Sequence, residues 1–443
     1  MSIAPKRLRP GLFFLPVVLT ALVLAVACGE EAAAPWAGTP SVPVEPGQLR
    51  IALLVPFTGA LAPFGPDFAN AANLAVEHIN AAGGVLGKPV RLIIGDDGTN
   101  PDQGVAEARR LVDIERVSAI VGAAASGVTL PIAESVTVPK KIVQISPSAT
   151  SPALTTLRDD DYLFRTPISD AAQGVVLARL VRELGFSKVC TMYVNNAYGQ
   201  GLSETFARTF QQLQGSVTAQ VSHTATTAPS YASELQRCVS GGPEALVAIS
   251  YPEGQADVYL REALERNLVR NFVFVDGTKS ADMFAKLGWD RFNGMKGTAP
   301  GALQTDAGRR FDDLFEQKYR YRYQNPFVRE SYDAVMVIAL AAEKAQSTDP
   351  TKIRDALRDI ANAPGRKFGP GPDDVKAALE AIRRGEDIDY DGASGSVEFD
   401  RNGDVTIGAI EVWRVDAAAR RLVTESVYRV DLSKSPPEVT RAQ

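Results

Sequence analysis

The chain has 443 residues, of which 45% are hydrophobic and 22% are charged, and its formal net charge at pH 7 is −5. A chain of this length is expected to form two or three globular domains whose cores need no disulfide or metal to hold them. The small net charge, and the lack of a basic patch interleaved with aromatic residues, argue against a nucleic-acid partner.

The first 27 residues predict a signal peptide for export. Three basic residues precede the apolar run "GLFFLPVVLTALVLAVA", which is short for a membrane-spanning helix. The stretch "LAVACGE" places Cys28 directly after small residues and resembles the lipobox of bacterial lipoproteins, whose cysteine is diacylated and becomes the mature N-terminus. Two acyl chains are a stable anchor. We therefore expect lipidation at Cys28, a flexible tether over residues 28–48, and a lipoprotein that faces the periplasm or the cell exterior; a plain secretory signal is the alternative.

Two cysteines remain in the exported part of the chain. Cys190 lies in an apolar run and Cys238 lies on a predicted helix. An oxidising compartment permits a disulfide between them. The spacing does not fix the distance between their Cα atoms, so two buried free thiols are equally consistent with the sequence.

From Leu49 onward, short apolar runs alternate with amphipathic segments. Strands are predicted in "LRIALLVPF", "VRLIIGD", "VSAIVGA" and "KIVQIS", with helices in "PDFANAANLAVEHINAAGG" and over about 101–115 and 129–136. This alternation predicts a parallel sheet covered by helices on both faces.

A second series of the same kind begins near Ser169. Its predicted strands are "KVCTMYV", "SVTAQVSH", "ALVAISY" and "NFVFVD", separated by helices near 170–184, 199–213, 229–240 and 254–266. After Gly297 the pattern predicts three long helices, over about 306–323, 326–345 and 351–363. Strands are then expected in "GSVEF", "TIGAIEVWRV" and "LVTESVYRV".

Polar and aromatic side chains follow the predicted strands at their carboxyl ends, where open α/β sheets bind ligands. Hydroxyls and the first turn of a predicted helix at Ser126 suit a small carboxylate, and the lone carboxylate of Asp276 suits an ammonium group. Singly, each residue is equally well explained as a helix cap or a turn residue. Together they predict a zwitterion site between two lobes, formed by Ser126, Ser148, Thr150, Tyr198, Tyr251 and Asp276.

Several motifs in order resemble a known family. "FGPDFANAANLAVEHINAAGGVLGKPV", "IVGAAASGVT", "ISPSATSPALT", "FRTPISDAAQG" and "YVNNAYGQGL" are similar to the type I periplasmic binding proteins of the leucine/isoleucine/valine-binding family, the substrate receptors of amino-acid ABC importers. The resemblance implies an α/β fold of two Rossmann-like lobes joined by three crossovers, which closes on its ligand like a Venus flytrap. It places lobe 1 at 49–167 plus about 300–395, and lobe 2 at 168–299 plus about 400–432.

The resemblance also implies roles for single residues. Ser126, beside Ala125, matches the serine that binds the ligand carboxylate, and Ser148 with Thr150 matches the pair that contacts the carboxylate and amino groups. Tyr198 and Tyr251 match aromatic residues of the second lobe. Asp276 matches the acidic residue that receives the ammonium group. Phe64 stands where the family often has Tyr, and Asp276 is shorter than the usual Glu, so a ligand other than Leu, Ile or Val stays open.

The resemblance implies a substrate-binding lipoprotein that delivers an amino acid to ABC permease subunits, without a cofactor. The alternative is a sensor of the same fold that presents a small carboxylate or amide to a signalling partner. An enzyme is not expected, because His78 and His223 are the only histidines and are interpreted as structural or surface residues. "AAGGVLGKPV" is similar to a phosphate loop but lacks its first Gly and its final Ser or Thr.

The stretch "DIDYDGASGSVE", from Asp387 to Glu398, fits the calcium-loop pattern D-x-[DN]-x-[DN]-G-x5-E. A loop of this kind needs a helix on each side, whereas a strand is predicted after it. No metal site is therefore expected, although calcium binding is the alternative. We interpret the stretch as a connector near the third crossover, with Gly392 and Gly395 at sharp turns and its aspartates in solvent.

Overall fold

The computed structural model describes residues 1, 2, 4, 45–301 and 303–442. The fold belongs to the compact unit Pro40–Gln443. Cys28, nearly all of the predicted signal peptide and most of the predicted tether lie outside the described residues. Among the helices that the structure describes, none combines the length and the apolar character needed to cross a bilayer.

The first lobe is built on a five-stranded sheet with strand order β2-β1-β3-β4-β5, in which every pair is parallel. The side chains of β1, β3 and β4 are buried throughout, which explains why these strands are mostly apolar in the sequence; the buried polar residues Arg50, Gln144 and Ser146 are hydrogen-bonded. The predicted strands are confirmed as β1 (Arg50–Val55), β2 (Arg91–Asp96), β3 (Ala119–Gly122) and β4 (Val143–Ser146), and β5 (Leu163–Arg165) completes the sheet.

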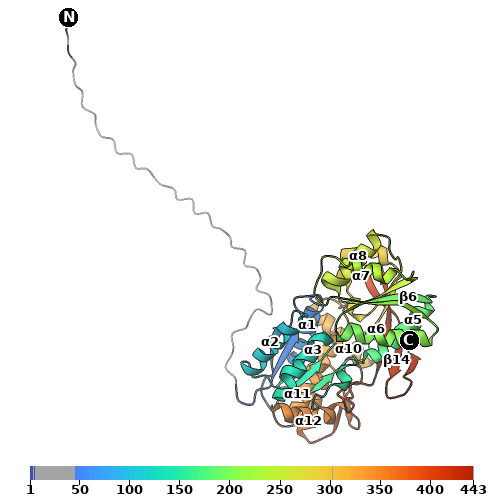
Figure 1. The fold of residues 1–443 in the computed structure, drawn as a ribbon. Coiled ribbons are helices and arrows are strands. Elements are labelled where there is room, and N and C mark those ends of the chain that lie inside the picture. The colour runs from blue at the N-terminus through green and yellow to red at the C-terminus, as the bar shows by residue number, and fades with distance from the viewer. Residues whose placement is uncertain (3, 5–44, 302, 443) are drawn as a thin grey trace. The chain divides into compact units, whose positions relative to one another are not determined.

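Helices from two separate stretches of the chain, 65–140 and 306–383, cover this sheet. In Figure 1, α1, α2, α3, α11 and α12 gather around it, and α1 packs against α10, α11 and α13. Local signals start these helices: Asn100 caps α2 by accepting from two backbone N–H groups, and Pro101 follows it. The helices are α1 (Gly65–Ala81), α2 (Pro101–Asp113), α3 (Ser126–Ile132), α4 (Val138–Lys140), α10 (Asp306–Tyr319), α11 (Val328–Lys344), α12 (Pro350–Ala361) and α13 (Pro372–Arg383).

The second lobe is built on an eight-stranded sheet with strand order β15-β14-β13-β10-β9-β8-β6-β7. Its first five strands in the chain are parallel, and its last three pair antiparallel. The strands are β6 (Lys188–Val194), β7 (Ser216–His223), β8 (Ala245–Ile249), β9 (Phe272–Phe274), β10 (Lys296–Gly301), β13 (Ile407–Asp416), β14 (Arg421–Asp431) and β15 (Glu438–Arg441).

The helices that were predicted between these strands are confirmed. They are α5 (Asp170–Glu183), α6 (Ala197–Gln212), α7 (Ala232–Val239) and α8 (Asp257–Glu265), and α9 (Ala281–Leu287) follows β9. Short 3₁₀ or π turns lie between the longer elements: η1 (Ala133–Thr137), η2 (Leu154–Thr156), η3 (Pro252–Ala256), η4 (Asp276–Thr278) and η5 (Trp289–Phe292).

The chain passes between the two sheets after β5, after β10 and before β13. These passages agree with the three crossovers implied by the family resemblance, while the exact lobe boundaries stay a prediction. In the segment before β13, Val405 forms one isolated β-bridge with Phe399 and another with Ile168, which follows β5. The third connection between the sheets therefore lies beside the first.

Two predictions for the region after Gly297 are wrong. A fourth long helix, α13, follows the three predicted ones, although its buried Val375, Leu379 and Ile382 show helical spacing in the sequence. "GSVEF" is not a strand and forms only isolated bridges, since the turn before it is held by side-chain hydrogen bonds instead. A small parallel pair, β11 (Arg366–Phe368) and β12 (Ile388–Tyr390), precedes it.

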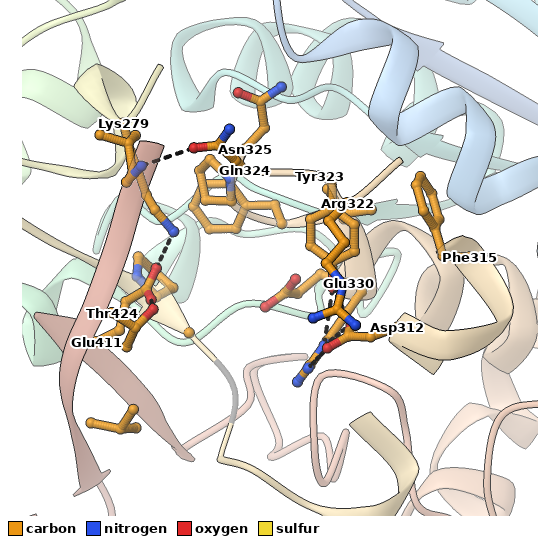
Figure 2. Close-up of a pocket in the computed structure, with 18 of the residues that line it drawn as sticks. Lys279, Asp312, Phe315, Arg322, Tyr323, Gln324, Asn325, Glu330, Glu411 and Thr424 are labelled. Carbon is orange, nitrogen blue, oxygen red and sulfur yellow. Dashed lines mark hydrogen bonds and ion pairs between the residues drawn. The ribbon is translucent and has the colours of Figure 1, made fainter. Parts of the chain in front are cut away.

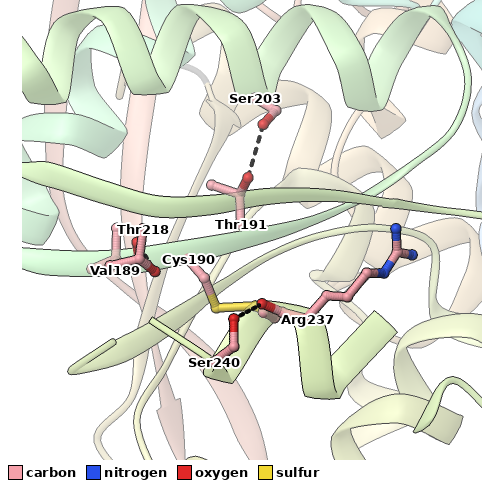
Figure 3. The surroundings of a disulfide bond; sticks show 8 residues. Val189, Cys190, Thr191, Ser203, Thr218, Arg237 and Ser240 are labelled. Atoms are coloured by element: carbon pink, nitrogen blue, oxygen red, sulfur yellow. Dashed lines mark hydrogen bonds between the residues drawn. A yellow bond between two sulfur atoms is a disulfide. The ribbon is translucent and has the colours of Figure 1, made fainter. Parts of the chain in front are cut away.

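The structure joins Cys190 to Cys238 in a disulfide with a Cα–Cα distance of 5.6 Å. Figure 3 shows the sulfur–sulfur bond passing from Cys190 on β6 to the helix that carries Arg237. Both half-cystines are fully buried in the apolar core of the second lobe. The disulfide therefore fastens α7 to the sheet and decides between the two possibilities that the sequence left open.

Candidate functional site

The carboxyl ends of the strands bring the predicted site residues together in one pocket, which we call the cleft pocket. All of the predicted ligand-binding residues except Thr150 line it, and both lobes contribute. The lining residues are Leu61, Phe64, Ala124, Ala125, Ser126, Ser148, Tyr198, Tyr251, Asp276, Gly277 and Phe327.

The first lobe presents hydroxyl and backbone groups to the cleft pocket. Ser148 follows β4 and donates its hydroxyl to the carbonyl of Ala124 at 2.9 Å. Ser126 is the first residue of α3, and its hydroxyl oxygen accepts the N–H of Ser151 at 3.2 Å. Because this contact uses only a lone pair, the hydroxyl hydrogen of Ser126 is available to another acceptor.

The second lobe presents a carboxylate and two stacked rings. Asp276 begins η4 directly after β9, and its Oδ1 accepts from the hydroxyl of Tyr198 at 2.7 Å and from the amide of Gln173 at 2.8 Å. The Tyr198 and Tyr251 rings stack with centroids 5.5 Å apart. Burial raises the pKa of Asp276 to about 6, although the hydrogen bonds from Tyr198 and Gln173 oppose the rise.

A second buried carboxylate, Asp170, lies near Asp276 and was not predicted. It is the first residue of α5 and is completely buried. Its Oδ2 accepts the hydroxyl of Thr150 at 2.9 Å, while its Oδ1 has no hydrogen-bond partner among the described residues. Burial, and then the charge of Asp276, raise the pKa of Asp170. In the sequence Asp170 is indistinguishable from an ordinary acidic residue in a helix's first turn.

This contact explains the position of Thr150. Thr150 is fully buried and does not line the cleft pocket, because its hydroxyl points to Asp170. Two amides were also missed: Gln173 supports Asp276, and Asn196 donates to the hydroxyl of Tyr251 at 3.1 Å. Gln173 lies within α5, away from any strand end, so only the packing of α5 reveals it, whereas Asn196 follows β6 in the same motif as Tyr198 and could have been found by the strand-end rule.

The two lobes touch across the cleft. The hydroxyl of Ser151 donates to the carbonyl of Ala197 at 2.8 Å, and the N–H of Glu253 donates to the carbonyl of Ala60 at 3.2 Å. The space in the cleft pocket that is open to the centre of a water molecule is about 20 Å³, little more than one water needs. The lobes are therefore in a closed arrangement, and a larger ligand has to enter while they are apart.

A family model described as periplasmic binding protein matches residues 48–420, most of the chain. The chain belongs to this family. Within the family it is a type I periplasmic binding protein of the leucine/isoleucine/valine-binding kind. It is 31% identical over 330 residues to the leucine-, isoleucine-, valine-, threonine- and alanine-binding protein of Pseudomonas aeruginosa, and the alignment covers 73% of this chain and 85% of the relative.

Two further comparisons agree with this membership. The fold is similar to the crystal structure of the leucine-binding protein LivK from Thermotoga maritima, with a TM-score of 0.72 and 24% identity over 86% of this chain and 98% of that one. The chain is also 26% identical over 359 residues to the chemotactic signal transduction system substrate-binding protein BasB of Halobacterium salinarum, covering 79% of this chain and 83% of the relative. Its relatives are thus substrate-binding proteins.

In this periplasmic binding protein the calcium-like stretch is organised around Asp333 of α11. Its carboxylate accepts from the hydroxyl of Tyr390 at 2.7 Å, from the N–H groups of Ala393 and Ser394 at 2.8 Å each, and from the Ser394 hydroxyl at 2.6 Å. An internal carboxylate therefore holds this turn, by four hydrogen bonds.

The interpretation of the aspartates in this stretch was partly wrong. Asp387 has an exposed side chain, as expected, but that of Asp389 is only 6% exposed and faces Lys367 at 3.9 Å. Asp387 immediately precedes the extended strand β12, and Asp389 lies in it. An extended strand spaces these residues along its axis, so their carboxylates do not converge on one ion as they do in a calcium loop. In the described part of the chain, no three histidine, cysteine or acidic residues are grouped as a metal site.

Both histidines of the binding protein are buried and hydrogen-bonded. Nδ1 of His78 lies 2.8 Å from the hydroxyl of Tyr332, and His223 contacts the carbonyl of Thr224 and the hydroxyl of Ser250. Burial lowers the pKa of each ring to about 4. Neither histidine lines the cleft pocket, which agrees with the structural interpretation and not with the surface one.

Proposed function

We propose that this protein is the substrate-binding component of an ABC importer and that it binds a small α-amino acid in the cleft pocket. The observation that carries the proposal is the pair of buried carboxylates Asp170 and Asp276. Neither forms an ion pair with a basic side chain of the described residues. Two close carboxylates in a buried site are strongly stabilised by a cation between them, and the ammonium of an amino acid supplies one.

The first lobe supports the other end of the ligand. The Ser126 hydroxyl has a free hydrogen, and no acceptor among the described residues takes the N–H of Ser126. A ligand carboxylate held there lies opposite Asp276, the aspartate that lines the pocket. Phe64, Leu61 and Phe327 supply apolar surface for the side chain, in keeping with a branched-chain-like or related amino acid. The relative named for leucine, isoleucine, valine, threonine and alanine supports the same class.

The two lobes are expected to close around the ligand, because each lobe carries only some of the groups that contact it. Ser126 and Ser148 belong to one lobe and Tyr198, Tyr251 and Asp276 to the other, so a ligand meets all of them only when the lobes are together. A ligand stabilises the closed form by the contacts that the open form lacks.

Calorimetry with matched compounds tests the proposal. Leucine, isoleucine, valine, threonine and alanine are compared with 4-methylpentanoate, which lacks the ammonium of leucine, and isopentylamine, which lacks its carboxylate. Each omission leaves a buried polar group unpaired, at about 1–3 kcal/mol, so the two analogues should bind about 5- to 150-fold more weakly than leucine if leucine binds. Binding of 4-methylpentanoate alone, with no amino acid bound, would refute the zwitterion site.

The resemblance to BasB favours one second candidate, a sensor that presents its ligand to a signalling partner. A strain that lacks the gene separates the two roles. Loss of labelled amino-acid uptake with normal taxis supports the importer, whereas normal uptake with lost taxis supports the sensor.

We further propose that Cys28 carries the lipid anchor, on the strength of the lipobox-like "LAVACGE". Changing Cys28→Ala should move the protein from the membrane fraction to the soluble one and remove the acyl mass from its N-terminal peptide. Persistence of the variant in the membrane would contradict the anchor.

A further inference from the structure

A second cavity lies beside the cleft pocket, and Phe327 forms a wall of both. About 240 Å³ of it is open to the centres of water molecules, compared with about 20 Å³ in the cleft pocket. Its walls come from both lobes: the segment 322–330 and α10 on one side, and Lys279, β13 and β14 on the other. Figure 2 shows these groups surrounding the open space.

Most charged groups of this cavity are paired with one another. Lys279 pairs with Glu411, whose carboxylate also accepts from the hydroxyl of Thr424. Arg329 forms two hydrogen bonds with Asp312, at 3.0 and 2.5 Å. Arg322 pairs with Glu316. Each of these lining cations therefore has its own carboxylate.

Glu330 is the exception. This residue of α11 is only 6% exposed and lines the cavity, and its backbone carbonyl accepts from Thr166 at 3.1 Å. No side chain among the described residues donates to its carboxylate, which accepts only from its own backbone N–H. In Figure 2 Glu330 lies between the Lys279–Glu411 pair and Asp312, and no dashed line reaches its carboxylate. A buried carboxylate without an ion-pair partner is costly, and burial accordingly raises the pKa of Glu330 to about 7.

We propose that the second cavity binds a small organic cation through its primary ammonium group, which pairs with Glu330. The chemistry of the walls defines this class. The other charged residues among the described lining residues each form an ion pair, and Glu330 does not. The rings of Phe315, Tyr323 and Phe327 give the apolar part of such a molecule a surface, and aromatic faces also attract cations. The site is separate from the proposed amino-acid site.

Titration of the full-length protein with propylammonium chloride, followed by calorimetry, tests this site. The neutral 1-propanol and the anionic propionate serve as shape-matched comparisons. We expect propylammonium to bind and the other two not to bind. Preferred binding of propionate would mean that Lys279, Arg322 and Arg329 dominate the cavity, and would overturn the proposal. The absence of propylammonium binding would overturn it as well.

Variants locate the bound cation. Glu330→Gln keeps the shape of the side chain and removes its charge, and should weaken propylammonium binding at least tenfold. Glu77→Gln, a change to an exposed carboxylate on α1 outside the cavity, should leave it unchanged. Asp276→Asn should also leave it unchanged. If binding instead survives in Glu330→Gln and is lost in Asp276→Asn, the cation binds in the cleft pocket and the proposal fails. The comparison of the three wild-type titrations does not depend on the folding of any variant.

Discussion

The hydroxyl of Thr150 donates to the carboxylate of Asp170 at 2.9 Å and so joins the loop after β4 of the first lobe to the first residue of α5. This contact places Asp170 beside the cleft, within the electrostatic influence of Asp276. The second lobe therefore holds two acidic groups near the cleft where the sequence alone suggested one, and of the two only Asp276 lines the pocket.

Removing either charge should weaken amino-acid binding. Asp276→Asn deletes the carboxylate that faces the ligand ammonium, and charged hydrogen bonds contribute about 1.5–3 kcal/mol, so affinity should fall by roughly 10- to 100-fold in calorimetry. Asp170→Asn removes a charge that lies behind the pocket lining and should cost less. Asp276→Ala should abolish measurable binding while the fold persists. Asp282→Asn, an exposed change on α9, is the control and should bind normally. Unchanged affinity in Asp276→Asn would remove Asp276 from the site.

Amino-acid affinity should depend on pH through Asp276. Burial raises the pKa of Asp276 to about 6 in the protein without ligand, and a protonated carboxyl does not pair with an ammonium. Affinity should thus be nearly constant from pH 8 to pH 7 and decrease as the pH falls through 6, approaching about tenfold per pH unit. Calorimetry across this range measures the decrease, and Asp276→Asn should flatten it. A wild-type affinity that is equal at pH 8 and pH 5 would contradict this role.

The turn before the third crossover should depend on Asp333 and not on calcium. Asp333→Ala leaves the N–H groups of Ala393 and Ser394 and the Tyr390 hydroxyl without their acceptor, and each buried unpaired group costs about 1–3 kcal/mol. The free energy of unfolding in urea should therefore drop by at least about 3 kcal/mol. Asp389→Asn, a change to the nearby calcium-pattern residue, should cost less. Calorimetric titration of chelator-treated protein with calcium should show no binding, and a calcium-dependent gain in stability would favour the ion instead.

The disulfide should stabilise the second lobe. Cys190 and Cys238 are 48 residues apart, and closing a loop of this length restricts the unfolded chain by about 4 kcal/mol in the chain-entropy model, with 2–5 kcal/mol typical of measured losses. The double change Cys190→Ala and Cys238→Ala should lower the free energy of unfolding by that amount. Amino-acid affinity should be preserved, because neither half-cystine lines the cleft pocket. Equal stability of wild type and double variant would show that the bond contributes little.

Local sequence patterns determined the alternating strands and helices of both lobes. Apolar runs such as "ALVAI" form buried parallel strands wherever helices cover both faces, so their pattern is visible without the fold. The same logic located most of the cleft pocket, because residues at the carboxyl ends of neighbouring parallel strands meet at one edge of a sheet. Tyr251 and Asp276, which follow the neighbouring strands β8 and β9, come together for this reason, whereas Ser126 follows β3 of the other sheet and meets them only because the lobes are closed. The motif resemblance added which lobe each belongs to.

Only the tertiary structure decided the features that depend on partners far away in the chain. Asp170 acquires its role from Asp276, more than a hundred residues later, and Asp389 is buried because Lys367 and the β11 strand pack beside it. The pairing of Cys190 with Cys238 and the isolation of Glu330 likewise depend on which side chains lie next to them. Sequence periodicity reports which face of an element is buried, whereas the charge or hydrogen-bond partner that a side chain meets there is set by how separate elements pack.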